Sequence, residues 1–214
     1  MRIALIHALR QSLPPIEAAF SRLWPRAQLM NLLDDSLSAD LARDGQLTSV
    51  MTERFVKLGR YAAKTGVDGI IFTCSAFGPC IETVARDLAP LPVLKPNEAM
   101  IEAATAIGGK IGLLATFPMT LQSMPGEFPS QIIIEAKLAE GALAALERGD
   151  GAEHDRLAAE AARSFTDCSA IALAQFSLAR AAKAVGDATG CPVLTTPESS
   201  VRKMMWLLER RLVT

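Results

Sequence analysis

The sequence predicts an α/β fold with two similar lobes, each holding a mostly parallel sheet of about four strands covered by helices. Two observations predict this fold. Short apolar runs typical of buried strands alternate along the chain with segments of helical periodicity, which favours parallel sheets covered on both faces. The pattern also restarts near the middle of the 214 residues, which suggests two lobes related by a pseudo-twofold axis.

The first half of the chain contains four predicted strands and four predicted helices. The strands are the apolar runs at residues 2–8, 27–33, 69–73 and 92–96. The helices follow them at residues 14–24, 48–65, 79–89 and 97–107. Prolines lie in the first turn of the helices at 14–24 and 79–89, a position that proline tolerates well. The helix at 48–65 carries one apolar face formed by Met51, Phe55, Leu58 and Ala62.

The second half repeats the alternation. Strands are predicted at residues 110–116, 130–135, 169–175 and 192–196. Helices are predicted near 136–148 and 152–165, and a terminal helix carries apolar residues at helical spacing, namely Val201, Met204, Met205 and Leu208.

Three pairs of segments align between the two halves in the same order. "VDGIIFTCSA" (67–76) aligns with "CSAIALAQFS" (168–177) at an offset of 101 residues, and "PVLKPNEAM" (92–100) with "PVLTTPESS" (192–200) at 100. "RIALIHA" (2–8) aligns with "KIGLLAT" (110–116) at 108. We therefore expect residues 1–97 plus 199–214 to form an N-terminal lobe and residues 98–198 a C-terminal lobe. The active-site cleft is expected between them, where the carboxyl ends of the strands meet.

Cys74 is the first candidate for chemistry because it follows the buried strand at 69–73. It precedes the helix predicted near Pro79, and the amino end of a helix favours an anion, so we expect a lowered thiol pKa. The alternative is that Cys74 is a small buried hydrophobic residue, as free cysteines often are. On the internal alignment, Cys74 corresponds to Gln175 of the second lobe.

The order of "DGIIFTCSAFG", "KIGLLATFPMTLQS", "SAIALAQFSLA" and "PVLTTPESSV" resembles the aspartate/glutamate/hydantoin racemase superfamily, which includes arylmalonate decarboxylase and maleate isomerase. The resemblance covers nearly the whole chain and implies two flavodoxin-like lobes. In racemases of that family two cysteines flank the substrate carbon. Cys74 matches the first, whereas the position of the second is Gln175. Cys168 does not replace it, because it lies seven residues earlier, before the strand.

The replacement of the second cysteine limits the possible reactions. Glutamine exchanges no proton near neutral pH, so a two-base racemase is disfavoured. Decarboxylation, isomerisation and elimination remain, with Cys74 as acid, base or nucleophile and Gln175 binding a carbonyl or carboxylate. One alternative is a one-base racemase or epimerase in which His7, or a water held by Gln175, supplies the second proton. Another is a carboxylate-binding protein without turnover.

Polar residues after the strands are candidates for substrate binding. Ser75, Thr116, Thr120 and Ser177 carry hydroxyl groups that suit a carboxylate, although capping of helices explains such residues equally well. Asp34 ends the second strand and His7 closes the first. For Asp34 a solvated turn, and for His7 a packed position, are the alternatives.

The composition excludes several other classes. A net charge of −1 gives no basic surface for nucleic acid or an anionic membrane, and no apolar run of about 18 residues indicates a membrane span. No phosphate-binding or dinucleotide-binding motif and no metal-ligand spacing occurs, so we expect no cofactor and no metal. We expect a cytoplasmic protein with free thiols that acts on a small carboxylate. The mean hydropathy of +0.24 makes a homo-oligomer possible.

Overall fold

The computed structural model describes residues 1–211, and its contacts divide the chain into two compact units. Lobe 1 comprises Met1–Glu98 and the segment from Ser200 onward, and lobe 2 comprises Ala99–Ser199. The expected N-terminal lobe also included residues 212–214, which lie outside the described residues. Within the described range, no helix is both long enough and apolar enough to cross a membrane.

Lobe 1 is built on a four-stranded parallel sheet in the order β2-β1-β3-β4. Its strands are β1 (Arg2–His7), β2 (Gln28–Leu33), β3 (Gly69–Phe72) and β4 (Val93–Leu94). Its helices are α1 (Leu13–Leu23), α2 (Ser36–Asp44), α3 (Ser49–Lys64) and α4 (Gly78–Asp87), joined by most of α10 (Thr196–Arg211). Short 3-10 helices η1 (Arg10–Ser12) and η2 (Ser75–Phe77) precede α1 and α4.

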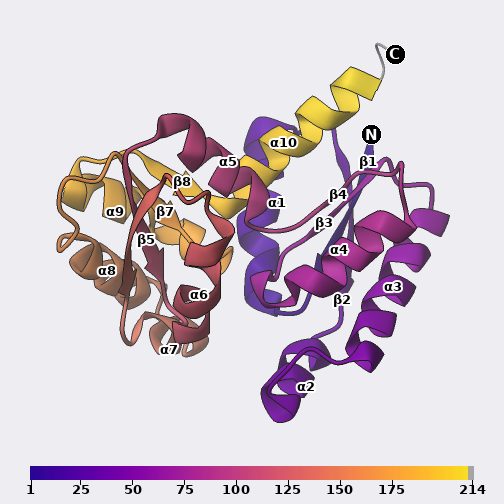
Figure 1. Cartoon of the computed structure of the whole chain (residues 1–214), viewed down its shortest axis with the longest axis horizontal. Helices are drawn as coiled ribbons and strands as arrows, with labels where there is room; N and C mark the ends of the chain where they lie inside the picture. The colour runs from indigo at the N-terminus through magenta and orange to yellow at the C-terminus, as the bar shows by residue number, and fades with distance from the viewer. Residues whose placement is uncertain (212–214) are drawn as a thin grey trace. The chain divides into compact units, whose positions relative to one another are not determined.

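The two faces of this sheet are covered by different helices. Ala4, Ile6 and Phe72 pack into one apolar cluster with residues of α3 and α4. Side chains alternate along a strand, so Leu5 and His7 point to the opposite face, where α1 lies (Figure 1). The sheet therefore positions its carboxyl edge rigidly, because both faces are buried.

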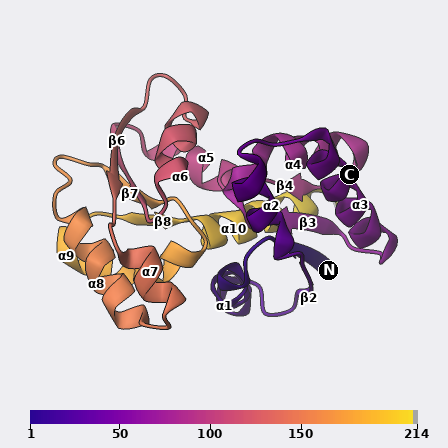
Figure 2. The same ribbon diagram turned by 90° about the horizontal axis from the view of Figure 1, so that it is seen from below.

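Lobe 2 repeats this architecture with the strand order β6-β5-β7-β8. Its strands are β5 (Lys110–Ala115), β6 (Ile133–Leu138), β7 (Ala170–Leu173) and β8 (Val193–Thr195). Its helices are α5 (Glu98–Ile107), α6 (Pro118–Ser123), α7 (Ala142–Glu147), α8 (Gly151–Ala162) and α9 (Ala182–Thr189), with 3-10 helices η3 (Met124–Glu127) and η4 (Ser177–Ala181). Helices α8 and α9 lie on one side of the sheet and α5 and α6 on the other (Figure 2).

The internal repeat is present in the strand register. Ile3 pairs with Gly69 in lobe 1, and Ile111 pairs with Ala170 in lobe 2, at the offsets of 108 and 101 found in the sequence. The pairs Ile70–Val93 and Ile171–Val193 agree in the same way. The predicted fold of two similar α/β lobes with four-stranded parallel sheets is thus confirmed.

The local predictions differ from the structure in a few segments. Helices α2, α6 and α9 were not expected. Strand β6 begins at Ile133, three residues later than predicted, and extends to Leu138, so residues 136–138 are not helical. Pairing explains this extension, because β6 aligns with β5 along its whole length and an edge strand tolerates charged residues such as Glu135 and Lys137.

Candidate functional site

Cys74 lies two residues beyond the end of β3, at the carboxyl edge of the lobe 1 sheet. It caps η2 with an extended backbone (φ −123°, ψ 116°) and is partly buried against the apolar cluster of α3 and α4. A narrow pocket there is lined by Cys74 together with Ile6, His7, Ala8, Leu37, Phe55 and Phe72. The thiol is therefore placed in apolar surroundings at a strand end.

The electrostatic environment of Cys74 differs from the expected one. Burial raises the pKa of its thiol to about 11, and a hydrogen bond with the backbone of Ala76 opposes this rise only in part. The expected lowering of the pKa by a helix amino end is wrong for this structure. Helix α4 begins only at Gly78, with η2 between it and Cys74, and desolvation is the largest influence on the pKa of the thiol. The thiol accordingly holds its proton at neutral pH.

His7 is the last residue of β1 and is fully buried. Its Nδ1 lies 2.8 Å from the hydroxyl of Thr73, and its Nε2 lies 3.0 Å from Oδ1 of Asn31. Burial lowers the pKa of His7, although the hydrogen bond to Asn31 and the charge of Glu17 act in the opposite direction. His7 lines the pocket of Cys74, but both of its ring nitrogens already have partners.

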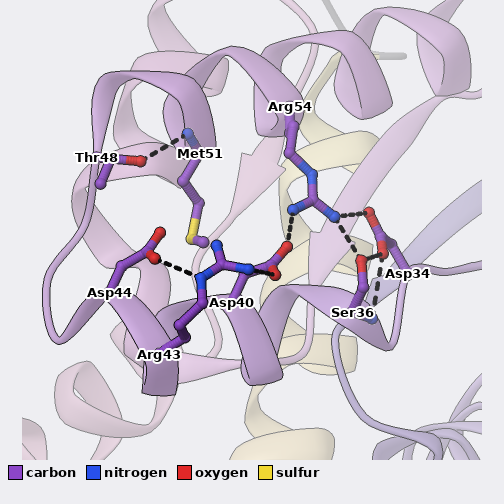
Figure 3. Close-up of polar contacts among 8 residues, drawn as sticks. All are labelled: Asp34, Ser36, Asp40, Arg43, Asp44, Thr48, Met51 and Arg54. Carbon is purple, nitrogen blue, oxygen red and sulfur yellow. Dashed lines mark hydrogen bonds and ion pairs between the residues drawn. The ribbon is translucent and has the colours of Figure 1, made fainter.

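Asp34 follows β2 and is engaged by an arginine of α3. Arg54 donates to Asp34 Oδ2 at 2.7 Å, to Ser36 and to Asp40 (Figure 3). Burial opposes the ionisation of Asp34, but the hydrogen bonds from Ser36 and Arg54 outweigh it and lower its pKa. The Asp34 carboxylate is thus occupied within lobe 1, and its most evident role is to fix the β2–α2 turn on α3.

A hollow of about 340 Å³ lies beside this ion-pair network. Its charged lining residues pair with one another: Arg43 contacts Asp40 and Asp44, and Arg54 bridges Asp40 to Asp34 (Figure 3). Such mutual pairing leaves no charge directed at a ligand, so we do not place the candidate site here.

Gln175 lies two residues beyond the end of β7, the position in lobe 2 that corresponds to Cys74 in lobe 1. Its Oε1 accepts hydrogen bonds from the backbone N–H of Thr116 at 2.6 Å and from the Thr116 hydroxyl at 3.0 Å. The amide oxygen is therefore used inside the lobe. The Nε2 group of Gln175 can only donate hydrogen bonds, and the residue as a whole is partly buried.

The remaining candidates lie at the carboxyl edges of the two sheets. Ser75 opens η2 and Ser177 opens η4, and both are partly buried. Thr120 is 7% exposed within α6. Thr195, which the sequence analysis missed, ends β8 beside β7 and is 5% exposed, yet its hydroxyl has no hydrogen-bond partner among the described residues. A buried hydroxyl without a partner is uncommon, and the adjacent Thr196 hydroxyl is in the same state, so both call for an explanation.

The structure thus brings Thr116 and Gln175 into direct contact and places His7 and Cys74 on one pocket. Asp34 turns to Arg54 instead. Sequence reasoning missed Arg54, Asn31 and Thr73 as partners of these candidates. The one signal for Thr73 was its place directly after the apolar run of β3, where a polar side chain lies at a strand end. Within the part of the chain that the structure describes, no group of three potential metal ligands was found.

Comparisons with known proteins show solved structures with the same fold. No family model and no curated protein matches the chain. Glutamate racemase from Thermus thermophilus, solved with β-chloro-D-alanine, is similar over 98% of this chain and 81% of its own, with 21% identity and a TM-score of 0.72. Allantoin racemase from Klebsiella pneumoniae has 20% identity and a TM-score of 0.74, with 98% and 88% covered. A cysteine mutant of arylmalonate decarboxylase with associated sulfate has 19% identity and a TM-score of 0.69, with 98% and 94% covered.

Proposed function

We propose that this chain is a cofactor-independent enzyme of the Asp/Glu racemase superfamily in which Cys74 transfers a proton next to a substrate carboxylate. One observation carries the proposal. Cys74 and Gln175 occupy equivalent positions after β3 and β7, but one offers a thiol and the other an amide whose oxygen Thr116 holds. The similarity to glutamate and allantoin racemases and to arylmalonate decarboxylase supports the superfamily.

The protonated state of Cys74 favours proton donation over nucleophilic attack. A thiol with a pKa of about 11 retains its proton at pH 7 and serves as a general acid. Decarboxylation uses such an acid. The C–C bond to one carboxylate breaks, carbon dioxide leaves, and the electron pair becomes the enolate of the remaining carboxylate. The enolate carbon then takes the thiol proton on one face, and water returns a proton to the thiolate.

Gln175 suits the binding of an oxygen that carries negative charge. Thr116 occupies its Oε1, so Gln175 presents Nε2–H donors, and donors directed at a developing enolate or a carboxylate lower the barrier of such a reaction. Glutamine cannot supply a proton to the second face. We therefore propose a product of single handedness instead of a racemate.

The test is the incorporation of solvent deuterium at the carbon next to the carboxylate. Substituted malonates, hydroxy acids and amino acids are screened by NMR in D₂O with wild type, Cys74→Ala and the matched control Cys168→Ala. We expect one deuterium and one enantiomer from a malonate, and a loss of about 10²–10⁴-fold in Cys74→Ala alone. Equal turnover in wild type and Cys74→Ala would refute the role of Cys74.

A second candidate function is carboxylate binding without turnover. The apolar burial and raised pKa of Cys74 favour this function, because an unreactive structural cysteine has the same two properties. Under this alternative, carboxylates bind wild type and Cys74→Ala equally and neither protein exchanges deuterium. The one-base racemase is less supported, since both ring nitrogens of His7 are engaged. We also propose that the protein is cytoplasmic and forms a homo-oligomer.

A further inference from the structure

A chain of side-chain hydrogen bonds crosses lobe 1 from its surface to the residue before Cys74. Glu17 of α1 accepts from Nδ2 of Asn31 on β2 at 2.7 Å. Asn31 Oδ1 lies 3.0 Å from Nε2 of His7 on β1, and His7 Nδ1 lies 2.8 Å from the hydroxyl of Thr73, just beyond β3. This series of hydrogen bonds therefore links α1, β2 and β1 to the residue that follows β3.

Glu17 fixes the direction of this chain at its outer end. An ionised carboxylate only accepts hydrogen bonds, so the group of Asn31 that faces Glu17 must be its NH₂. Turning the amide over would set two acceptor oxygens against each other. The Oδ1 atom of Asn31 consequently faces His7, and it can only accept.

The tautomer of His7 follows from the same argument. Because Asn31 Oδ1 accepts, Nε2 of His7 carries a hydrogen and donates it. The ring is fully buried and its pKa is lowered, so the neutral form is favoured and Nδ1 has a free electron pair. The hydroxyl of Thr73 donates to that pair at 2.8 Å, in preference to the carbonyl of Ile6 at 3.4 Å.

We propose that Glu17 and Asn31 are positioning residues that hold His7 in its Nε2–H tautomer and thereby fix Thr73, from which the Cys74 loop departs. The catalytic part of this inference rests on the proposed function, whereas the tautomer does not. Two side chains, those of Asn31 and Thr73, hold the neutral ring of His7, and each hydrogen bond in the series requires the direction of the previous one. An ordered starting point for the loop keeps the thiol within reach of one face of the substrate carbon.

The direct test is ¹⁵N NMR of the histidine rings. The chain has only two histidines, His7 and His154, so His154→Gln identifies the His7 signals. We expect Nε2 of His7 to be protonated and Nδ1 unprotonated at pH 7. Glu17→Ala should shift the ring signals toward a mixture of tautomers, and Glu17→Gln, which still offers an acceptor oxygen, should restore them. Glu53→Ala, an exposed glutamate of α3, is the matched control.

A protonated Nδ1 in wild type, or ring signals unchanged in Glu17→Ala, would overturn the inference. The second readout is turnover of a substrate found by the deuterium screen. We expect Glu17→Ala and Asn31→Ala to lower kcat by about tenfold or more, with KM little changed and Glu53→Ala unaffected. Unchanged kcat in both variants would refute the positioning role. If wild type turns over no substrate at all, the proposed function fails, and the NMR result decides the tautomer by itself.

Discussion

Cys74 is expected to resist alkylation at neutral pH in the folded protein. With a pKa of about 11, about one thiol in 10,000 is ionised at pH 7, against about one in 100 for the ordinary value of 9.0. Since only the thiolate reacts, burial slows the reaction about 100-fold through ionisation alone. The rate should rise about tenfold for each pH unit from 7 to 10.

The assay is pulsed labelling with iodoacetamide between pH 7 and 10, followed by mass spectrometry of the Cys74 peptide. Protein unfolded in urea supplies the reference for the same peptide. Restricted access to the pocket lowers the labelling rate by the same factor at every pH. The pKa of Cys74 is therefore read from the shape of the pH profile and not from the absolute rate. A plateau below pH 8 would mean a lowered pKa, and the assignment of Cys74 as a resting acid would then be wrong.

The cause of the raised pKa is open to a direct perturbation. Leu37 of α2 is 1% exposed and lines the pocket of Cys74. Leu37→Ala should admit water beside the thiol and lower its pKa from about 11 toward 9.0, so the labelling rate should begin to level off by pH 10, where the wild-type rate still rises. The same variant should cost about 2–5 kcal/mol in the free energy of unfolding. A labelling profile with the wild-type shape in a folded variant would exclude burial at this pocket as the cause.

Three further predictions follow from the polar groups at the sheet edges. Gln175→Glu should raise KM for a carboxylate about tenfold or more. Thr116 would hold one oxygen of the new carboxylate, and the other oxygen would repel the ligand. An unchanged KM in steady-state assays would contradict this. Arg54→Met should lower the free energy of unfolding by about 1–3 kcal/mol at pH 7 in urea titrations. Because the pKa of Asp34 is lowered, its contribution is present above about pH 3.8 and is lost as the pH falls through the folded-state value; a difference that does not shrink as the pH is lowered from 3.8 would argue against Asp34 as the source. Thr195→Val should leave stability nearly unchanged, since the hydroxyl has no partner, but should weaken carboxylate binding measured by calorimetry; equal affinity would remove Thr195 from the site.

The fold was predictable because its signals are periodic. The buried strands β1, β3, β5 and β7 form apolar runs bounded by turn residues, and the repeat offsets carry over to the pairing register. Edge elements were harder to predict. Strand β6 carries the ion pair of Glu135 and Lys137, and these charged residues interrupt the apolar pattern by which a buried strand is recognised.

The candidate site was predictable in position but not in electrostatics. A strand end followed by polar residues located Cys74 and Gln175. The sequence could not show that Arg54 pairs with Asp34. It also could not show that Thr73 and Asn31 hydrogen-bond to the two ring nitrogens of His7. These contacts join residues 20 to 66 positions apart. Whether a thiol is desolvated also depends on packing across such distances, whereas only the helix that follows Cys74 could be predicted locally.

The repeat itself suggests why the two equivalent positions differ in chemistry. The residue after β1 is Ala8 in lobe 1, and the corresponding residue after β5 is Thr116 in lobe 2, at the same offset of 108. Thr116 gives Gln175 a hydroxyl donor, whereas Ala8 gives the pocket of Cys74 only a methyl group. Ala8→Ser should therefore place a donor beside the thiol, stabilise the thiolate and lower the pKa from about 11, visible as an earlier rise in the labelling profile. Ala8→Gly is the matched control, because it changes size without adding a donor. If both variants give the wild-type profile, the residue after the first strand does not set the chemistry of its lobe, and the pairing of cysteine with alanine and of glutamine with threonine is coincidental.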